Sequence, residues 1–276
     1  MRIKLLAASF AILFAQAVAS AAPAPAPVPV PMIPAGPWNV EFADSMCLLS
    51  RPYGQDGATR LIFKPGMVGD DLELIVTKAT SDIGDIVDGK VVLSINGKPL
   101  LADSYFTAYS TKQARVLRIW NKEDAIALSA IRGTVKIDTK AAGRHYFAIP
   151  GIDQALPVLS RCLDQLRTAY KVSKSDLAAI ATKPDGRIFR YFTTADYPSE
   201  ALSNDQAGTV GVLFWVETTG RVSTCEVIET SAAPILGKTT CDILIKRARL
   251  TPAKDAEGRA IRAPVFSRIR WELATF

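Results

Sequence analysis

Histidine is nearly absent from this chain of 276 residues, which has only His145. Because histidine is the side chain most often used as a general base and as a zinc ligand, its scarcity disfavours catalytic triads and multi-histidine metal sites. The sequence also lacks a glycine-rich phosphate loop, a Gly-x-Ser-x-Gly element and a glycosidase pattern. We therefore expect no catalytic residues, no cofactor and no metal site, and we interpret His145 as a packed or surface residue of a strand.

The chain also has only a small excess of positive charge. The formal net charge is +6 at pH 7, with 33 basic residues against 27 acidic ones. This excess is too weak to indicate a nucleic-acid partner. The chain is 49% hydrophobic and 22% charged, which is too apolar for a disordered protein, so we expect a packed core.

Long apolar runs are missing except at the N-terminus. There, Arg2 and Lys4 precede an apolar run over 5–15, and small residues follow up to Ala19 and Ala21. This order is typical of a secretory signal peptide, which we place at 1–21, and it predicts a periplasmic protein. The alternative is an uncleaved segment that anchors the chain in the inner membrane, because apolar and small residues continue to 22.

Alternating proline follows the predicted signal peptide. Residues 22–37 are rich in Pro and Ala, a composition that favours extended polyproline II geometry without a core of its own. We interpret this segment as a proline-rich leader.

The four cysteines are even in number, and none belongs to a metal-type Cys-x-x-Cys pair. This pattern agrees with export to an oxidising compartment. Four cysteines allow three pairings, and free buried thiols are a further alternative. Spacing favours Cys47 with Cys162 and Cys225 with Cys241, one bridge in each half of the chain.

Residues 38–170 contain short β-branched and aromatic runs separated by turn residues. We predict strands at 38–42, 60–63, 72–76, 91–95, 116–120, 134–137 and 146–149, and a hairpin turn at Asn96 and Gly97. A helix is expected at 122–131. A second helix carries an apolar stripe from Ile152 to Leu166. We therefore predict a disulfide-stapled β-rich domain of unknown function that is closed by a helix.

Residues 171–192 are polar and form a predicted linker that contains one helical turn at 176–181. A second domain covers 193–276. Asp196 is expected to cap a short helix that begins near Pro198. Strands are predicted at 209–217 and 221–229, a helix at 234–249 with Cys241, Leu244, Ile245 and Ala248 on one face, and a last strand at 261–273. The fold class is therefore α+β.

The second domain carries an ordered set of short motifs. A Tyr-Pro pair is followed by a glycine that opens the first strand, a glycine in the hairpin, and a Pro-Ala element before the last strand: Tyr197, Pro198, Gly208, Gly220, Pro252 and Ala253. In their order and spacing these residues resemble the C-terminal domain of the TonB family. The resemblance implies a small domain in which an antiparallel sheet packs on helices.

The resemblance also implies binding. Members of that family hold an extended segment of an outer-membrane receptor by adding it as a strand to an open sheet edge. The matching edge here is the last strand, where alternation places the arginines toward solvent. The candidate partner-binding residues are Arg262, Phe266, Arg268, Arg270 and Trp271. The partner would be a segment of an outer-membrane receptor or of another envelope protein, which relates the chain to TonB-dependent transport.

Two features separate the chain from complete energy transducers of that family. Its first apolar segment has no histidine, and its proline-rich leader is too short to cross a periplasm. We therefore expect a non-catalytic binding or adaptor protein. Two alternatives remain: an envelope enzyme with an unrecognised site in the N-terminal domain, and a membrane-anchored transducer if the signal is not cleaved. The sequence leaves the oligomeric state open.

Overall fold

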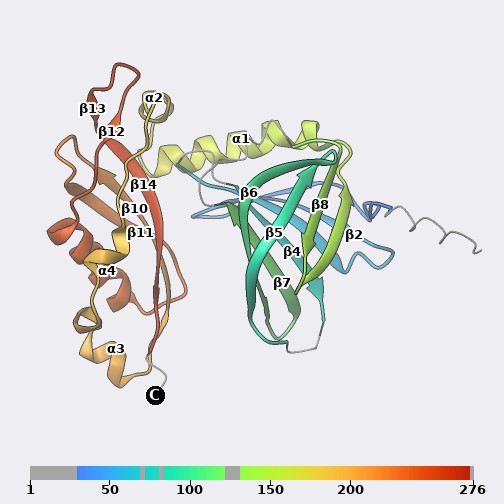
Figure 1. Cartoon of the computed structure of the whole chain (residues 1–276), viewed down its shortest axis with the longest axis horizontal. Helices are drawn as coiled ribbons and strands as arrows, with labels where there is room; N and C mark the ends of the chain where they lie inside the picture. Colours follow the sequence, from blue (N-terminus) through green and yellow to red (C-terminus); the bar gives the residue numbers. More distant parts are fainter. Residues whose placement is uncertain (1–29, 69–71, 81–83, 122–130, 274–276) are drawn as a thin grey trace, which may run out of the picture. The chain divides into compact units, whose positions relative to one another are not determined.

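The computed structural model describes residues 30–68, 72–80, 84–121 and 131–273. The predicted signal peptide, the first part of the proline-rich leader and the helix expected at 122–131 (apart from Ile131) lie outside these residues. The helical and strand elements are shown in Figure 1.

The N-terminal region is an antiparallel sheet of nine strands in the order β1-β2-β3-β4-β7-β6-β5-β8-β9. All seven predicted strands are present, and the structure adds β2 and the long β6. The bounds are β1 Asn39–Phe42, β2 Cys47–Tyr53, β3 Thr59–Pro65, β4 Leu72–Ala79, β5 Val87–Ile95, β6 Lys98–Ser110, β7 Ala114–Asn121, β8 Thr134–Thr139 and β9 Gly143–Ala148.

The turn between β5 and β6 is the predicted one. Asn96 and Gly97 have φ angles of 50° and 73°, as a two-residue hairpin turn with two left-handed residues requires. β2 escaped prediction because Arg51 and Pro52 interrupt its apolar run, and a proline inside a run argues against a strand. Pro52 is accommodated because β1 pairs with β2 only as far as Ser50. Beyond that point the backbone of Pro52 faces residues 32–35, where its C=O accepts from Ala35 N.

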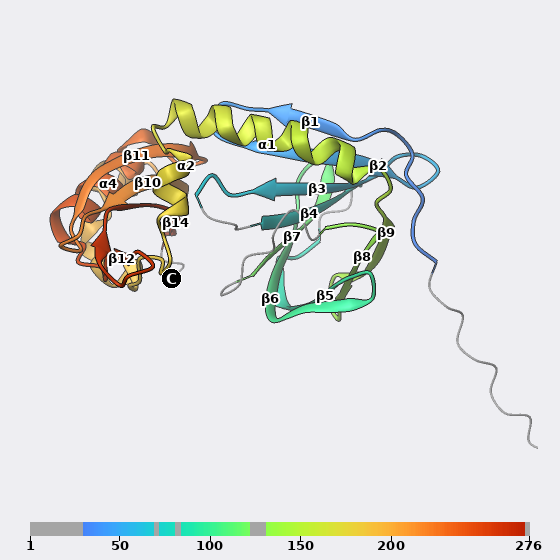
Figure 2. The ribbon, with the colours of Figure 1, turned by 90° about the horizontal axis from the view of Figure 1, so that it is seen from above.

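The end of the proline-rich leader closes this sheet. Met32 bonds to β9 through its N–H, which donates to Tyr146 O at 2.6 Å, and through its C=O, which accepts from Ala148 N at 3.1 Å. Two residues later the segment turns to β2, where Ala35 N donates to Pro52 O at 2.9 Å. Residues 32–35 therefore join the two sides of the sheet into a barrel, visible from above in Figure 2, and this end of the leader lies within the domain rather than ahead of it.

Helix α1 (Ile152–Ala169) packs on β1 and β2 of the barrel. Its buried face includes Ile152, Leu159, Leu163 and Leu166, as predicted, whereas Leu156 is only partly buried. The Cys47–Cys162 disulfide ties the helix to β2. Barrel side chains and this helix face together form the larger hydrophobic core.

The predicted linker is partly ordered by the C-terminal region. Helix α2 (Lys174–Ala178) starts at a capping box formed by Ser173 and Asp176. Farther along, Thr182 and Asp185 pair with the main chain of Lys254 and Thr251. Two short 3₁₀ turns follow, η2 Ile188–Tyr191 and η3 Thr194–Asp196.

The C-terminal region follows the predicted order of helix, hairpin, helix and strand, which together with the barrel confirms the α+β class. Its three-stranded antiparallel sheet has the order β11-β10-β14, and β12 and β13 form a separate ribbon. The bounds are α3 Ser199–Ser203, β10 Gly208–Val216, β11 Val222–Thr230, α4 Pro234–Arg247, β12 Ala253–Lys254, β13 Ala260–Ile261 and β14 Ala263–Trp271.

Helix α4 covers one face of this sheet and forms a second hydrophobic core with it. The Cys225–Cys241 disulfide links β11 to α4, so both bridges of the favoured pairing are present. The predicted helix face was wrong at one position, because Ile245 is 41% exposed. Leu236, Thr240, Ile243 and Leu244 supply the buried face instead.

The predicted cap at Asp196 was also wrong. Helix α3 begins after Pro198 with no side-chain cap. Asp196 instead accepts hydrogen bonds from Thr193 and forms an ion pair with Arg247 of α4 at 2.7 Å. The Arg247 hydrogen bond lowers the pKa of Asp196 to about 2. Asp196 thus completes a capping box with Thr193 at η3 and forms a tertiary ion pair, rather than capping α3.

Candidate functional site

Strand β14 is an edge strand of the C-terminal sheet. It pairs with β10 along its whole length, from Gly208 opposite Trp271 to Val216 opposite Ala263. No other described strand pairs with its second side. Helix α2 contacts β14.

The backbone groups of β14 that face outward follow from hydrogen bonds on β10. The carbonyl oxygen of Thr209 accepts from Ser231 N at 3.0 Å, and Thr209 N donates to Ser231 Oγ at 3.1 Å, so both groups point toward β11. In an antiparallel pair these groups change sides at each residue. Val210 therefore faces β14, where its partner is Ile269. The N–H and C=O groups that face outward belong to Phe266, Arg268 and Arg270.

Pro264 supports this assignment. Pro264 lies two residues before Phe266, so its backbone nitrogen points to the same, unpaired side of the strand. Proline has no N–H to donate and is tolerated in sheets where that position faces away from the ladder. Strand β14 thus offers a row of unpaired backbone donors and acceptors from Phe266 onward.

The side chains of β14 divide between two faces. Ile269 and Trp271 are 4% and 6% exposed and lie in the core under α4. Trp271 Nε1 donates to Thr240 Oγ1 at 3.0 Å, and its ring lies nearly perpendicular to that of Tyr197 at a centroid distance of 5.2 Å. The alternate residues Phe266, Arg268 and Arg270 lie on the opposite face.

Arg268 forms an ion pair across the sheet. Its guanidinium donates to both carboxylate oxygens of Glu229 on β11, with distances of 2.9 to 3.2 Å. The residue between them on β10 is Gly211, paired with both. An added Cβ there would lie 3.0 Å from Glu229 Cβ and 3.2 Å from the Phe266 ring, so glycine leaves the space that the pair crosses.

A barrel residue completes this cluster. Lys64 of β3 binds Glu229 Oε1 at 2.9 Å, and the side chains of Lys64 and Glu229 are only 11% and 17% exposed. Burial raises the pKa of Glu229, but Arg268 and Lys64 together outweigh that effect and hold the pKa below its usual value. Burial and then Arg268 lower the pKa of Lys64. The Glu229 carboxylate therefore forms ion pairs with two cations, Lys64 and Arg268.

We expect Glu229→Gln to lower the free energy of unfolding by about 2 kcal/mol at pH 7, because it removes charge-assisted hydrogen bonds from two partly buried cations, Lys64 and Arg268. A carboxyl with a depressed folded pKa stabilises the fold above its unfolded pKa and loses this contribution as the pH falls through the folded value. The difference in the free energy of unfolding between wild type and variant should therefore become smaller below about pH 4. Urea unfolding at several pH values measures this, and a constant difference would contradict it.

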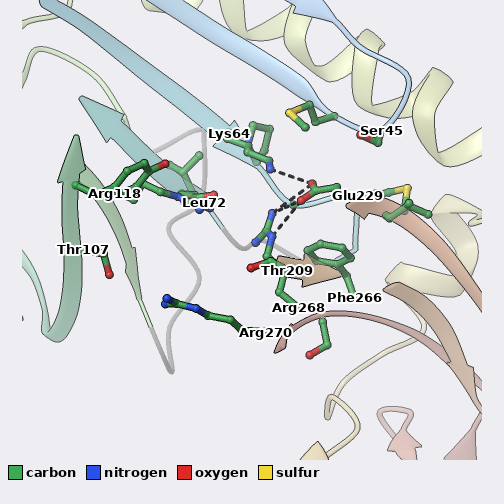
Figure 3. Close-up of a pocket in the computed structure, with 18 of the residues that line it drawn as sticks. Ser45, Lys64, Leu72, Thr107, Arg118, Thr209, Glu229, Phe266, Arg268 and Arg270 are labelled. Atoms are coloured by element: carbon green, nitrogen blue, oxygen red, sulfur yellow. Dashed lines mark hydrogen bonds and ion pairs between the residues drawn. The ribbon is translucent and has the colours of Figure 1, made fainter. Parts of the chain in front are cut away.

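The charged face of β14 lines a cavity of about 1110 Å³. Figure 3 shows Lys64 and Arg268 pointing toward the Glu229 carboxylate, while Arg270 points away from it. A second ion pair, between Arg118 of β7 and Glu73 of β4, lies on the barrel side. Other lining residues include Met67, Leu72, Thr107, Tyr109, Thr209 and Ile228.

One comparison decides the identity of this region. A family model described as the Gram-negative bacterial TonB protein C-terminal matches residues 193–273. These residues are a TonB C-terminal domain. No curated protein matches the chain. The domain indicates a location in the Gram-negative envelope, a TonB-related role in envelope transport, and interaction with envelope or outer-membrane proteins.

The motif residues of the TonB C-terminal domain hold its fold. Tyr197 O–H donates to Gln206 O at 2.6 Å, Pro198 precedes α3, Gly208 opens β10, and Pro252 precedes the buried Ala253. Gly220 has a φ of 78°, and an added Cβ would lie 2.0 Å from the Leu250 carbonyl oxygen. A larger residue at 220 would force the β10–β11 hairpin away from Leu250, which follows α4.

The structure brings together only part of the predicted binding set. Phe266, Arg268 and Arg270 line the cavity, whereas Trp271 lies in the core. Arg262 precedes β14, packs over the Trp215 ring at 3.8 Å and pairs with Glu217 at 2.8 Å. Of the arginines predicted to face solvent, Arg270 is 66% exposed and Arg268 only 33%.

Sequence reasoning missed Lys64, Glu73, Arg118 and Glu229. Each is one of two charged residues in its strand, and no spacing signal links residues that far apart. His145 lies in β9 beside Phe147, and burial lowers its pKa. Within the described ranges, no group of three His, Cys, Asp or Glu residues is placed to hold a metal, and no helix is both long and apolar enough to cross a membrane.

Proposed function

We propose that this protein is an exported periplasmic adaptor whose TonB C-terminal domain binds an extended segment of an outer-membrane receptor or another envelope protein. The segment adds as a strand to β14. The observation that carries the proposal is the row of outward backbone groups at Phe266, Arg268 and Arg270, because main-chain hydrogen bonds supply the affinity in strand addition.

The periplasmic location is supported by two features. The N-terminal sequence has the order of a signal peptide, and the two disulfides suit an oxidising compartment. N-terminal sequencing of the exported protein tests the location, since an intact Met1 would favour the membrane-anchored alternative.

A non-catalytic role is part of the proposal. Its support is the sequence, which has none of the searched catalytic motifs and only one histidine. The barrel would then act as a structural or binding partner of the TonB C-terminal domain rather than as an enzyme.

A backbone substitution tests strand addition directly. Arg270→Pro removes an outward N–H while leaving the bonds between β14 and β10, and Arg270→Ala removes the same side chain but keeps the N–H. We expect Arg270→Pro to weaken the binding of receptor-derived peptides about tenfold more than Arg270→Ala does, the equivalent of one hydrogen bond. Calorimetric titration measures the affinities.

Circular dichroism and thermal unfolding check that both variants keep the fold. Equal affinities of the two folded variants would contradict binding through the β14 backbone. Absence of binding of any receptor peptide to the wild-type protein would contradict the proposed function as a whole.

A further inference from the structure

The cavity runs along the open edge of β14. Phe266, Ser267 and Arg268 are consecutive and all line it, and Arg270 lies farther along. Successive strand residues point to opposite faces of a sheet. A cavity lined by three residues in a row therefore touches the main chain of β14 as well as the side chains of one face, beside the outward backbone groups of Phe266 and Arg268. A strand added to β14 would enter this cavity.

The barrel supplies the opposite wall. Lining residues come from β3, β4, β6 and β7, among them Lys64, Glu73, Thr107 and Arg118. The volume of about 1110 Å³ is at or above the upper end of roughly 300–1,000 Å³ for small-molecule pockets. A segment of polypeptide is therefore an occupant of suitable size, and it would contact both the TonB C-terminal domain and the barrel.

The cavity has a surplus of positive charge. Its lining includes four cations, Lys64, Arg118, Arg268 and Arg270, and two anions, Glu73 and Glu229. Arg118 is matched by Glu73, but Lys64 and Arg268 share Glu229. Arg270 pairs with Glu272, and both side chains are about two-thirds exposed, so this pair is weak and exchangeable.

We propose that this cavity is a docking groove for an extended partner segment that carries acidic residues at alternate positions. The inference rests on the proposed strand addition and specifies the partner's chemistry. Arg268 and Arg270 lie two residues apart on one face, and an added strand repeats that spacing on the same face. Acidic side chains at alternate positions therefore meet both arginines, and an apolar side chain at the next alternate position meets Phe266.

The chain's own N-terminal segment is a poorer occupant. Residues 1–30 contain no Asp or Glu, so they lack the charge that the groove favours. A free small anion would satisfy the arginines but would leave the outward backbone groups and the length of the cavity unused.

Two synthetic peptides of eight residues test the proposal with the full exported chain. One has Glu at alternate positions followed by an apolar residue, and the other has Gln in place of each Glu. We expect the Glu peptide to bind about tenfold more tightly at low salt, with the difference shrinking as salt rises. Equal binding of the two peptides would overturn the acidic preference and would leave strand addition intact.

Charge variants locate the preference in the groove. Arg270→Glu should abolish or reverse the preference for the Glu peptide while the Gln peptide still binds. Lys64→Gln should reduce the preference severalfold, because Lys64 belongs to the barrel wall. Lys98→Gln is the matched control, since Lys98 is an exposed barrel lysine that does not line the cavity. A preference unchanged in Arg270→Glu, or equally reduced by Lys98→Gln, would overturn the proposal.

Crosslinking distinguishes the groove from attraction at long range. A photoreactive residue on the groove-facing side of the Glu peptide should label β14 together with barrel strands β4, β6 or β7. Labelling of β14 alone would show strand addition without the barrel wall and would overturn the groove. Competition by inorganic phosphate that displaces the Glu peptide but not the Gln peptide would reveal a simple anion site and would count against the proposed segment.

Discussion

Replacing both Cys47 and Cys162 by alanine should lower the free energy of unfolding of the barrel by about 4–5 kcal/mol. The bridge closes a loop with a sequence separation of 115 residues, and the chain-entropy model predicts a loss of that size when such a crosslink is removed. Both cysteines are buried, at 0% and 2% exposure. The bridge also fixes α1 against β2, so its loss should free the helix from the barrel.

Denaturant unfolding followed by circular dichroism measures this loss. The matched control is the double alanine variant of Cys225 and Cys241, whose bridge spans 16 residues and is worth about 3 kcal/mol in the same model. Hydrogen exchange assigns each loss to its domain. If the first variant lost less stability than the second, native contacts of α1 rather than the crosslink would hold the helix on β1 and β2.

Local patterns predicted the elements of the TonB C-terminal domain well. Its hairpin, its α4 helix and its last strand follow from alternation, from the 3.6-residue period and from turn glycines such as Gly220, all of which act over short distances. The same holds for α1 and for the Asn96-Gly97 turn. Local reasoning failed at Asp196, which completes a capping box with Thr193 at η3 and pairs with Arg247 instead of capping α3.

The candidate site depends on contacts that no local pattern encodes. Alternation predicts that Arg268 and Trp271 lie on opposite faces of β14. It does not show that Glu229 stands across Gly211, or that Lys64 reaches the same carboxylate from a strand 165 positions earlier in the chain. Barrel closure by residues 32–35 is equally non-local, because composition alone makes that segment resemble a free leader.

The charged side chains of β14 bear both on aggregation and on the choice of partner. An unpaired edge is a template for aggregation, and charged side chains on it discourage the pairing of copies with one another. Arg268 shares Glu229 with Lys64, whereas Arg270 pairs with the exposed Glu272. In the proposed docking groove, the same arginines that discourage pairing with a second copy of β14 would attract an acidic strand, which would join protection against aggregation to choice of partner.

Trp271 separates folding from binding on the same strand. We expect Trp271→Ala to lower the free energy of unfolding of the TonB C-terminal domain by about 3–5 kcal/mol, the usual cost of deleting a buried large aromatic side chain. The residue is 6% exposed, bonds to Thr240, and packs against Tyr197. Its indole thus belongs to the core, although its backbone lies at the end of the edge strand.

Two controls define the origin of the Trp271 effect. Trp271→Phe keeps most of the ring contacts but removes the bond to Thr240, whose hydroxyl still donates to Leu236 O at 2.8 Å. It should therefore cost less than the alanine variant, with about 1 kcal/mol from the one lost hydrogen bond. Arg270→Ala, the adjacent exposed position, should change stability by less than about 0.5 kcal/mol. If Trp271→Ala left stability unchanged and lowered peptide affinity instead, the indole would act in partner binding and not in the core.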